Sequence, residues 1–112
     1  KWDCMLDRQA KIGYIRLGPI ESRADEVVAG MLADLAKRGC RGLVLDLRWC
    51  PGGYVDPGVL TAALFLKPGA VVADLSYRNP PPTATAGKYT VPNAPGAGAY
   101  ADLPLAVLIG PE

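Results

Sequence analysis

The residues best suited to chemistry follow a short apolar segment near the middle of the chain. Residues 42–48 read GLVLDLR and lead, two residues later, into a Pro-Gly-Gly turn at 51–53. In α/β proteins, ligands bind beyond the carboxyl ends of strands, where turns present unpaired backbone N–H groups. Adjacent glycines admit positive φ, and their N–H groups can polarise a carbonyl oxygen. Gly52 and Gly53 are therefore candidate donors to the carbonyl oxygen of a ligand, although Gly-Gly taken alone is more often a plain tight turn.

Asp46 and Arg48 precede this turn on the strand side. Because side chains alternate along a strand, both project from the same face. A charged pair there can either orient a ligand or brace the glycine turn. We expect bracing, since an Arg at a strand end more often binds backbone carbonyls or a carboxylate than a substrate. Asp46 and Arg48 are thus predicted to support the site.

Four further side chains surround the turn. Cys50 could be a reactive thiol, but the sequence offers no base close to it, and a free structural cysteine is the expected role. Trp49 and Tyr54 either line a pocket, in which case Tyr54 would contact a substrate, or pack in the core. Asp56 precedes a proline and is predicted to be the N-cap of a helix.

The composition excludes several classes of function. The 112 residues are half hydrophobic and 21% charged, which is typical of one globular domain, and no apolar run approaches the roughly 18 residues of a membrane span. Twelve basic and eleven acidic residues are interspersed, so no nucleic-acid partner is expected. The chain has no histidine, and its three cysteines, Cys4, Cys40 and Cys50, lack CxxC spacing. We therefore expect no metal, no cofactor, and no Ser-His or Cys-His catalytic pair within these residues.

Hydrophobic periodicity predicts strands and a helix around the glycines. Residues 11–17 and 42–48 are predicted strands, the second apolar on both faces and therefore central in its sheet. Between them, a helix is predicted over residues 22–38, because apolar residues recur at helical spacing and predict a buried stripe of Val27, Val28, Met31, Leu32 and Leu35. It begins with a capping box that pairs Ser22 with the acidic residue three positions later, and Gly39 is the left-handed residue that ends it.

The second half of the chain repeats this alternation. A second helix is predicted from Asp56, and residues 71–77 and 103–109 are predicted strands. Between these strands, the proline- and glycine-rich residues 79–98 are predicted to form a surface excursion, with strand character only at 88–91. The resulting order of elements predicts a single domain of the α/β class.

Three blocks of the sequence together resemble one protein family. The blocks are KIGYIRL at 11–17, RGLVLDLRWCPGG at 41–53 and LPLAVLIGPE at 103–112. They look like the core of the tail-specific, or C-terminal processing, serine proteases, the S41-like family. This resemblance implies an α/β fold with a superhelical core of the ClpP and crotonase type. Cys50 stands where that family commonly has Asn.

The resemblance also implies how the chain is divided. Residues 1–10 would be the approach from an upstream PDZ-like domain, and residues 11–112 the N-terminal part of the protease core. The family's nucleophilic serine and its general-base lysine would both lie beyond residue 112, so we expect the chain to be a piece of a longer protein. The resemblance carries over half of an oxyanion hole, a backbone N–H of Gly52 or Gly53.

The activity implied by the resemblance is that of a serine endopeptidase. It would cleave protein or peptide substrates near a free C-terminus, at the cell envelope or outside the cell, whereas the 112-residue chain by itself is predicted to be inactive. Two other function classes use a similar scaffold. They are a non-catalytic ligand-binding module similar to the retinoid-binding repeats and a crotonase-like acyl-thioester enzyme, and the fold alone does not decide among the three.

Overall fold

The computed structural model describes residues 3–76, 78–79, 87–93 and 96–110. Within these ranges the chain forms two helices and six strands. In chain order they are β1 (Asp3–Asp7), β2 (Ile12–Arg16), α1 (Ala24–Lys37), β3 (Gly42–Asp46), α2 (Val55–Ala63), β4 (Val71–Leu75), β5 (Gly87–Thr90) and β6 (Leu105–Leu108).

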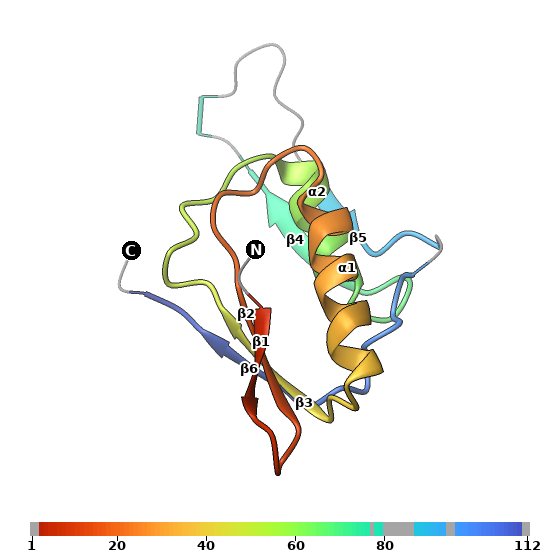
Figure 1. Cartoon of the computed structure of the whole chain (residues 1–112). Helices are drawn as coiled ribbons and strands as arrows, with labels where there is room; N and C mark the ends of the chain where they lie inside the picture. The colour runs from red at the N-terminus through yellow and green to blue at the C-terminus, as the bar shows by residue number, and fades with distance from the viewer. Residues whose placement is uncertain (1–2, 77, 80–86, 94–95, 111–112) are drawn as a thin grey trace.

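The main sheet holds four of these strands in the order β1-β2-β3-β6 (Figure 1). β2, β3 and β6 run parallel, and β1 pairs antiparallel with β2. β3 lies between β2 and β6, which confirms its predicted central position. Because β3 and β6 are parallel neighbours, their carboxyl ends lie at the same edge of the sheet. The segment that follows β3 at this edge, residues 47–53, is called the glycine turn below.

β4 and β5 form a separate two-stranded antiparallel sheet. Both were predicted as strands, but β4 pairs with β5 instead of joining the main sheet, so the two segments form a unit of their own between α2 and β6. Val91, inside the predicted surface excursion, is buried. Its N–H donates to the carbonyl of Ala70 at 2.8 Å. Residues 80–86 and 94–95 of that excursion lie outside the described residues.

The hydrophobic core lies between the main sheet and α1, which runs along one side of the sheet (Figure 1). Side chains from one face of β2 and β3 meet the apolar stripe of α1, and the buried set includes Ile15, Leu43, Leu45, Val28, Met31, Leu32 and Leu35. The predicted helical stripe is thus confirmed at four positions. Val27, which was predicted as part of it, is 54% exposed.

Both predicted helix starts are wrong. α1 begins at Ala24 with Arg23 as its N-cap, and no side chain caps it. Ser22 therefore lies one position before the N-cap. A side chain caps a helix from the N-cap position itself, so Ser22 does not cap α1. α2 begins at Val55 with Tyr54 as its N-cap. Asp56 lies in the first turn of α2 instead, where a carboxylate faces the positive end of the helix dipole.

The predicted end of α1 is confirmed. Gly39 has φ +79°, the left-handed conformation that glycine adopts without strain. Its N–H donates to Ala36 at 3.0 Å, and the N–H of Cys40 donates to Leu35 at 3.1 Å. This pair of hydrogen bonds is a Schellman motif, and it returns the chain from α1 toward β3.

Residues 3–7 are tied into the main sheet. β1 pairs with β2 from Asp3 to Asp7, with an irregularity between Met5 and Asp7. The Asp3 carboxylate also lies 3.6 Å from the Arg38 guanidinium just beyond α1. The predicted division at residues 10 and 11 concerns a longer protein, and it stays a prediction.

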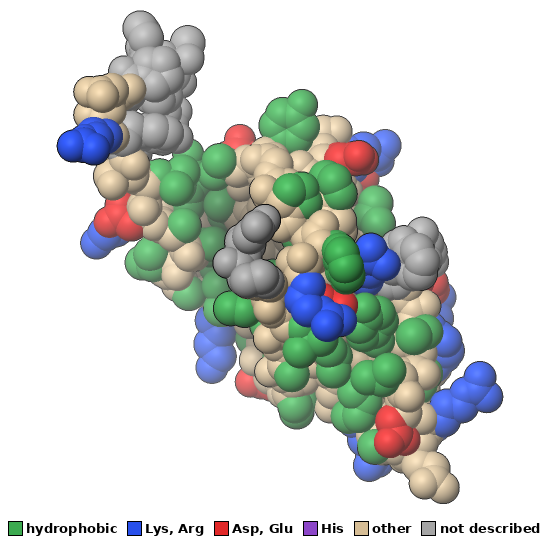
Figure 2. Space-filling view, turned by 90° about the vertical axis from the view of Figure 1, so that its left-hand side faces the viewer, with side chains coloured by type: hydrophobic (Ala, Val, Ile, Leu, Met, Phe, Trp, Pro, Cys, Tyr) green, Lys and Arg blue, Asp and Glu red, His purple; other side chains and the backbone are tan. Residues whose placement is uncertain are grey.

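Apolar side chains are exposed around the carboxyl ends of β3 and β6. Figure 2 looks onto the side of the molecule that carries these ends, and hydrophobic side chains are spread over it with charged groups between them. Trp49, Tyr54, Val107 and Ile109 are among the large apolar residues that solvent reaches. Cys4 is an exposed free thiol on β1, at the opposite edge of the main sheet from β6.

Among the described residues, neither helix combines the length and apolar composition that crossing a bilayer requires. In the same part of the chain, no three His, Cys, Asp or Glu side chains gather as metal ligands would.

Candidate active site

The glycine turn contains two backbone conformations that favour glycine. φ is +101° at Gly52 and +152° at Gly53. The Ile20 N–H donates to the Gly52 carbonyl at 2.8 Å, and the Tyr54 N–H donates to the Ile20 carbonyl at 3.0 Å. A Cβ on Gly53 would overlap the backbone of Ile20, whereas the space around Gly52 is open. Position 53 therefore requires glycine for both its conformation and its close approach to the neighbouring chain.

The N–H groups of Gly52 and Gly53 donate to no acceptor among the residues that the structure describes, and both glycines are exposed. Successive backbone N–H groups in a turn form a concavity that suits a negatively charged oxygen. The turn thus presents donors that an incoming acceptor can reach.

Asp46 is fully buried at the end of β3, and its carboxylate accepts four hydrogen bonds. Oδ1 accepts from the backbone N–H of Arg48 at 3.1 Å and from its Nε at 3.0 Å. Oδ2 accepts from Nη2 of Arg48 at 2.9 Å and from the hydroxyl of Tyr14 at 2.6 Å. The structure thus brings the two predicted supporting residues into direct contact, and it adds Tyr14 to them.

These contacts shift the pKa values of all three groups. Hydrogen bonds from Arg48, and after it from Tyr14, hold the pKa of Asp46 well below its usual range. The hydrogen bond to Asp46 raises the pKa of Tyr14, and burial raises it further. The same Asp46 contact raises the pKa of Arg48. At neutral pH, Asp46 is therefore ionised and the Tyr14 hydroxyl keeps its proton.

Trp49 and Tyr54 are not core residues. Trp49 is 60% exposed and Tyr54 is 66% exposed, so of the two alternatives for these residues, packing in the core is wrong. The Trp49 ring lies under the Arg16 guanidinium, 5.0 Å from the ring centroid, in a cation–π contact that links β2 to the turn. Tyr54 stands at the N-terminus of α2.

A small apolar pocket of about 170 Å³ lies behind the glycine turn. It is formed by the end of β3, the segment after β2 and one face of α2, and its lining residues are Leu17, Ile20, Leu45, Leu47, Cys50, Gly58, Thr61, Ala62 and Phe65. Cys50 is a free thiol at its wall, next to the glycines. The predicted pocket residues Trp49 and Tyr54 are not among those that line it.

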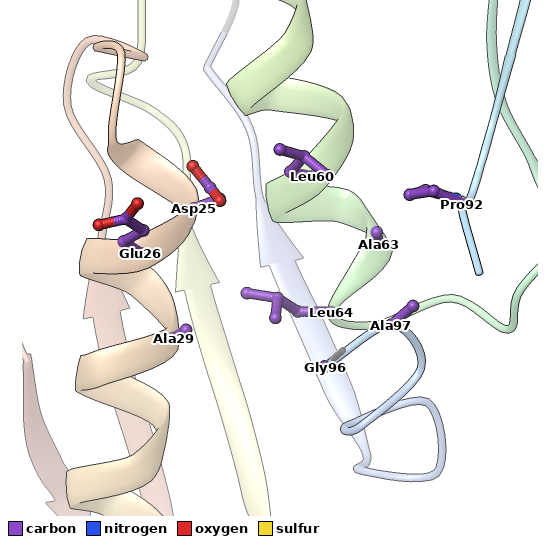
Figure 3. A pocket seen from close by; sticks show the side chains of 9 residues that line it. All are labelled: Asp25, Glu26, Ala29, Leu60, Ala63, Leu64, Pro92, Gly96 and Ala97. Carbon is purple, nitrogen blue, oxygen red and sulfur yellow. The ribbon is translucent and has the colours of Figure 1, made fainter. Parts of the chain in front are cut away.

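A second pocket, of about 240 Å³, lies between α1, α2 and the residues Pro92, Gly96 and Ala97 (Figure 3). Asp25 and Glu26 of α1 stand on one side of it, and Leu60 of α2 and Leu64, the C-cap of α2, stand on the other. None of the predicted site residues lines this pocket, so it is separate from the glycine turn.

The chain that leaves β6 passes beside the glycine turn. The Leu47 N–H donates to the carbonyl of Leu108, the last residue of β6, at 2.8 Å. Gly110 lies against the backbone of Arg48, where a Cβ would come within 3.3 Å of the Arg48 carbonyl oxygen. The carboxyl ends of β3 and β6 therefore bring these two segments to one place.

Sequence reasoning missed Tyr14 and Ile20 as parts of this site. Tyr14 carried a usable signal, because the alternation of residues 11–17 places it on one strand face, and parallel pairing with the strand of Asp46 would have placed the two side chains together. Ile20 carried none. Its part in the site is a backbone pairing with Gly53 that depends on where the loop after β2 lies.

Comparison with known proteins identifies a family. Residues 11–112 match peptidase family S41. The carboxyl-terminal-processing protease of Synechocystis sp. is 33% identical over 98 residues, which are 88% of this chain and 21% of that protein. The carboxy-terminal processing protease CtpA of Bacillus subtilis is 28% identical over 68 residues, 61% of this chain and 15% of that protein.

Among solved structures, the photosystem II D1 C-terminal processing protease is similar, with a TM-score of 0.66 and 28% sequence identity. The likeness covers 88% of this chain and 23% of that protein. The chain thus spans about a fifth of the length of the relatives it matches. The family match includes β2 to β6 and the whole glycine turn. By both sequence and fold, the chain belongs to peptidase family S41.

Proposed function

We propose that the protein containing this chain is a serine endopeptidase that processes other proteins near their C-termini. Membership of family S41 supports the reaction class, and the relatives named above are all C-terminal processing proteases. These comparisons lend no support to a non-catalytic binding module or to acyl-thioester chemistry. The proposed substrate is a protein or peptide with a free C-terminus.

In the proposed mechanism, a serine hydroxyl attacks the scissile carbonyl and a neutral lysine takes the proton. Both residues are proposed to lie beyond residue 112, in the remainder of a superhelical, crotonase-like core to which residues 1–10 are the approach. The lysine has to be neutral, so burial must lower its pKa from about 10.4 toward the working pH. Backbone N–H groups stabilise the oxyanion of the tetrahedral intermediate.

The observation that carries this proposal is the pair of N–H groups on Gly52 and Gly53, in the turn after β3, which donate to no acceptor within the described part of the chain. We propose that one of them is half of the oxyanion hole. The segment that leaves β6 passes beside the turn, which supports a nucleophile delivered from that side. Asp46 and Arg48 support the turn.

Substrate side chains have two surfaces available near these donors. The apolar pocket behind the turn suits a small apolar side chain next to the scissile bond. Tyr54, exposed at the start of α2, is proposed to contact the substrate outside that pocket.

The test replaces one N–H at a time without changing backbone conformation. A proline fits neither glycine, because its φ is fixed near −65°, and alanine at position 53 would overlap Ile20. Glycolate at position 52 or 53 turns one amide into an ester and removes only the donor. Loss of the oxyanion donor should lower kcat roughly 100- to 1,000-fold with a smaller effect on KM.

Glycolate at Gly18 is the matched control. Gly18 also has an N–H that bonds none of the described residues, and it lies outside the turn. The melting temperature of each ester variant reports any loss of folding. Full kcat in both turn variants, at unchanged melting temperature, would refute the oxyanion role.

A further inference from the structure

The glycine turn is held at both ends by one neighbouring segment, β2 and the loop after it. At its start, the Tyr14 hydroxyl binds the Asp46 carboxylate, which in turn accepts the backbone N–H of Arg48. At its end, the backbone of Ile20 pairs with the residues on either side of Gly53. The second attachment consists of backbone alone. The first combines a backbone hydrogen bond, from the Leu17 N–H to the Asp46 carbonyl at 3.1 Å, with two side-chain contacts, the cation–π contact of Trp49 and the hydrogen bond of the Tyr14 hydroxyl to the Asp46 carboxylate.

The contact between Tyr14 and Asp46 reaches diagonally across two strands. Tyr14 is the register partner of Val44, and its hydroxyl extends to the carboxylate two residues further along β3. Without that hydroxyl, Oδ2 of Asp46 would lose one of the two donors that reach it from the described residues and keep the Arg48 guanidinium, whose side chain is 50% exposed. The carboxylate would then be held less firmly. Its Oδ1 also accepts the Arg48 N–H, so a shift of the carboxylate would loosen the first bend of the glycine turn, where the Cys50 N–H donates to the Leu47 carbonyl at 3.0 Å.

We propose that Tyr14 is a positioning residue for the glycine turn. By holding Asp46, it keeps the N–H groups of Gly52 and Gly53 where an acyl oxygen would bind. Its effect passes through Asp46 and the backbone, and Tyr14 itself contacts no substrate. The catalytic part of this inference rests on the proposed oxyanion role of the glycines, whereas the structural part does not.

The experiment compares two variants that each lose one tyrosine hydroxyl and keep the ring. Tyr14→Phe removes the contact to Asp46. Tyr100→Phe is the matched control, because the Tyr100 ring packs on Phe65 and its hydroxyl bonds none of the described residues. Spectra of ¹⁵N-labelled chain record the amide signals of the glycine turn. The kcat and KM of the whole protein are measured on a peptide with a free carboxyl terminus.

Tyr14→Phe should shift the amide signals of Gly52 and Gly53. It should also lower kcat roughly 10- to 100-fold, because a small misplacement of a catalytic group costs rate, while KM stays nearly unchanged. Tyr100→Phe should change neither quantity. Because kcat is referred to folded protein in each sample, a simple loss of stability would not lower it.

Other results would decide against the positioning role of Tyr14 or against the proposed function. Unmoved glycine signals in Tyr14→Phe, or equal shifts in the control, would overturn the positioning role. Glycine signals that shift while kcat stays at the wild-type value would support positioning and count against the oxyanion hole. A whole protein that hydrolyses no peptide would refute the proposed function, and the glycine signals would still test Tyr14.

Discussion

At the residue scale, Asp46 is a carboxylate without solvent exposure, and its negative charge has to be compensated inside the protein. A buried carboxylate remains ionised only when charged or polar partners replace its lost hydration. Arg48 supplies the opposite charge, and Tyr14 supplies a further donor from the adjacent strand. Asp46 and Arg48, which the sequence predicts as a brace, are therefore hydrogen-bonded to each other, and each carboxylate oxygen of Asp46 accepts from two donors.

This arrangement predicts an acid-sensitive contribution to stability. Because folding lowers the pKa of Asp46, the carboxylate stabilises the fold at pH values above about 4, its ordinary pKa, and this stabilisation is lost as the pH falls below that value. Asp46→Asn should therefore be less stable than wild type at neutral pH. The difference should narrow progressively toward about pH 3.

Urea unfolding of the chain at a series of pH values measures this difference. Asp74→Asn is the control, because Asp74 is an exposed carboxylate on β4. Its stability curve should run parallel to that of wild type. Curves for Asp46→Asn and wild type that stay parallel into acid would contradict the assignment.

At the scale of elements, the two ends of α1 are terminated by different means. Its start has no side-chain cap, and the nearby Arg23 side chain instead donates from Nε to Glu26 at 2.9 Å on an exposed surface. Its end has a complete Schellman motif at Gly39. Backbone conformation therefore matters at the C-terminus of α1, whereas the serine before its N-terminus is dispensable.

We expect Ser22→Ala to change the free energy of unfolding by less than about 0.5 kcal/mol, since its side chain makes no cap. A capping serine would cost about 1 kcal/mol when removed. Gly39→Ala should destabilise by about 1–2 kcal/mol, because the added Cβ is strained at positive φ although the space around it is open. Urea midpoints of the two variants make the comparison. A larger loss for Ser22→Ala than for Gly39→Ala would show that the N-terminus of α1 is capped after all.

At the scale of the whole molecule, the described residues form one part of the proposed active site, and the proposed nucleophile and base belong to another part. The described residues form the glycine turn, its two attachments and the pocket behind it. The apolar strand β6, however, is exposed along its length, and its residue Val107 is 45% exposed. No described serine contacts a base: Ser22 and Ser76 are exposed, and neither makes a hydrogen bond within the described residues.

The 112-residue chain should accordingly have no peptidase activity. Incubation with an unstructured peptide that has a free carboxyl terminus, followed by mass spectrometry, should reveal no cleavage product. The double variant Ser22→Ala, Ser76→Ala separates contaminants from the chain itself. Turnover that survives repurification and disappears in that variant would overturn the prediction.

Most elements could be predicted because their signals are local. Alternation places Ile15 on one face of its strand, and helical spacing places Val28 and Leu32 on one stripe, whatever the rest of the chain does. Helix starts were predicted less well at Ser22 and Asp56. A capping residue is defined by where the first turn begins, and packing against the sheet moves that point by a residue or two.

The sequence by itself determined the α/β class, the central strand, and the place of two glycines at the carboxyl end of that strand. It also carried the family resemblance. The tertiary structure decided the strand pairing, the separate β4–β5 sheet, and the meeting of Tyr14 with Asp46 and of Ile20 with Gly53. Tyr14 and Asp46 are 32 residues apart in the chain, and only the parallel register of β2 on β3 makes them neighbours. Such contacts depend on how whole elements pack, and no local pattern encodes that choice.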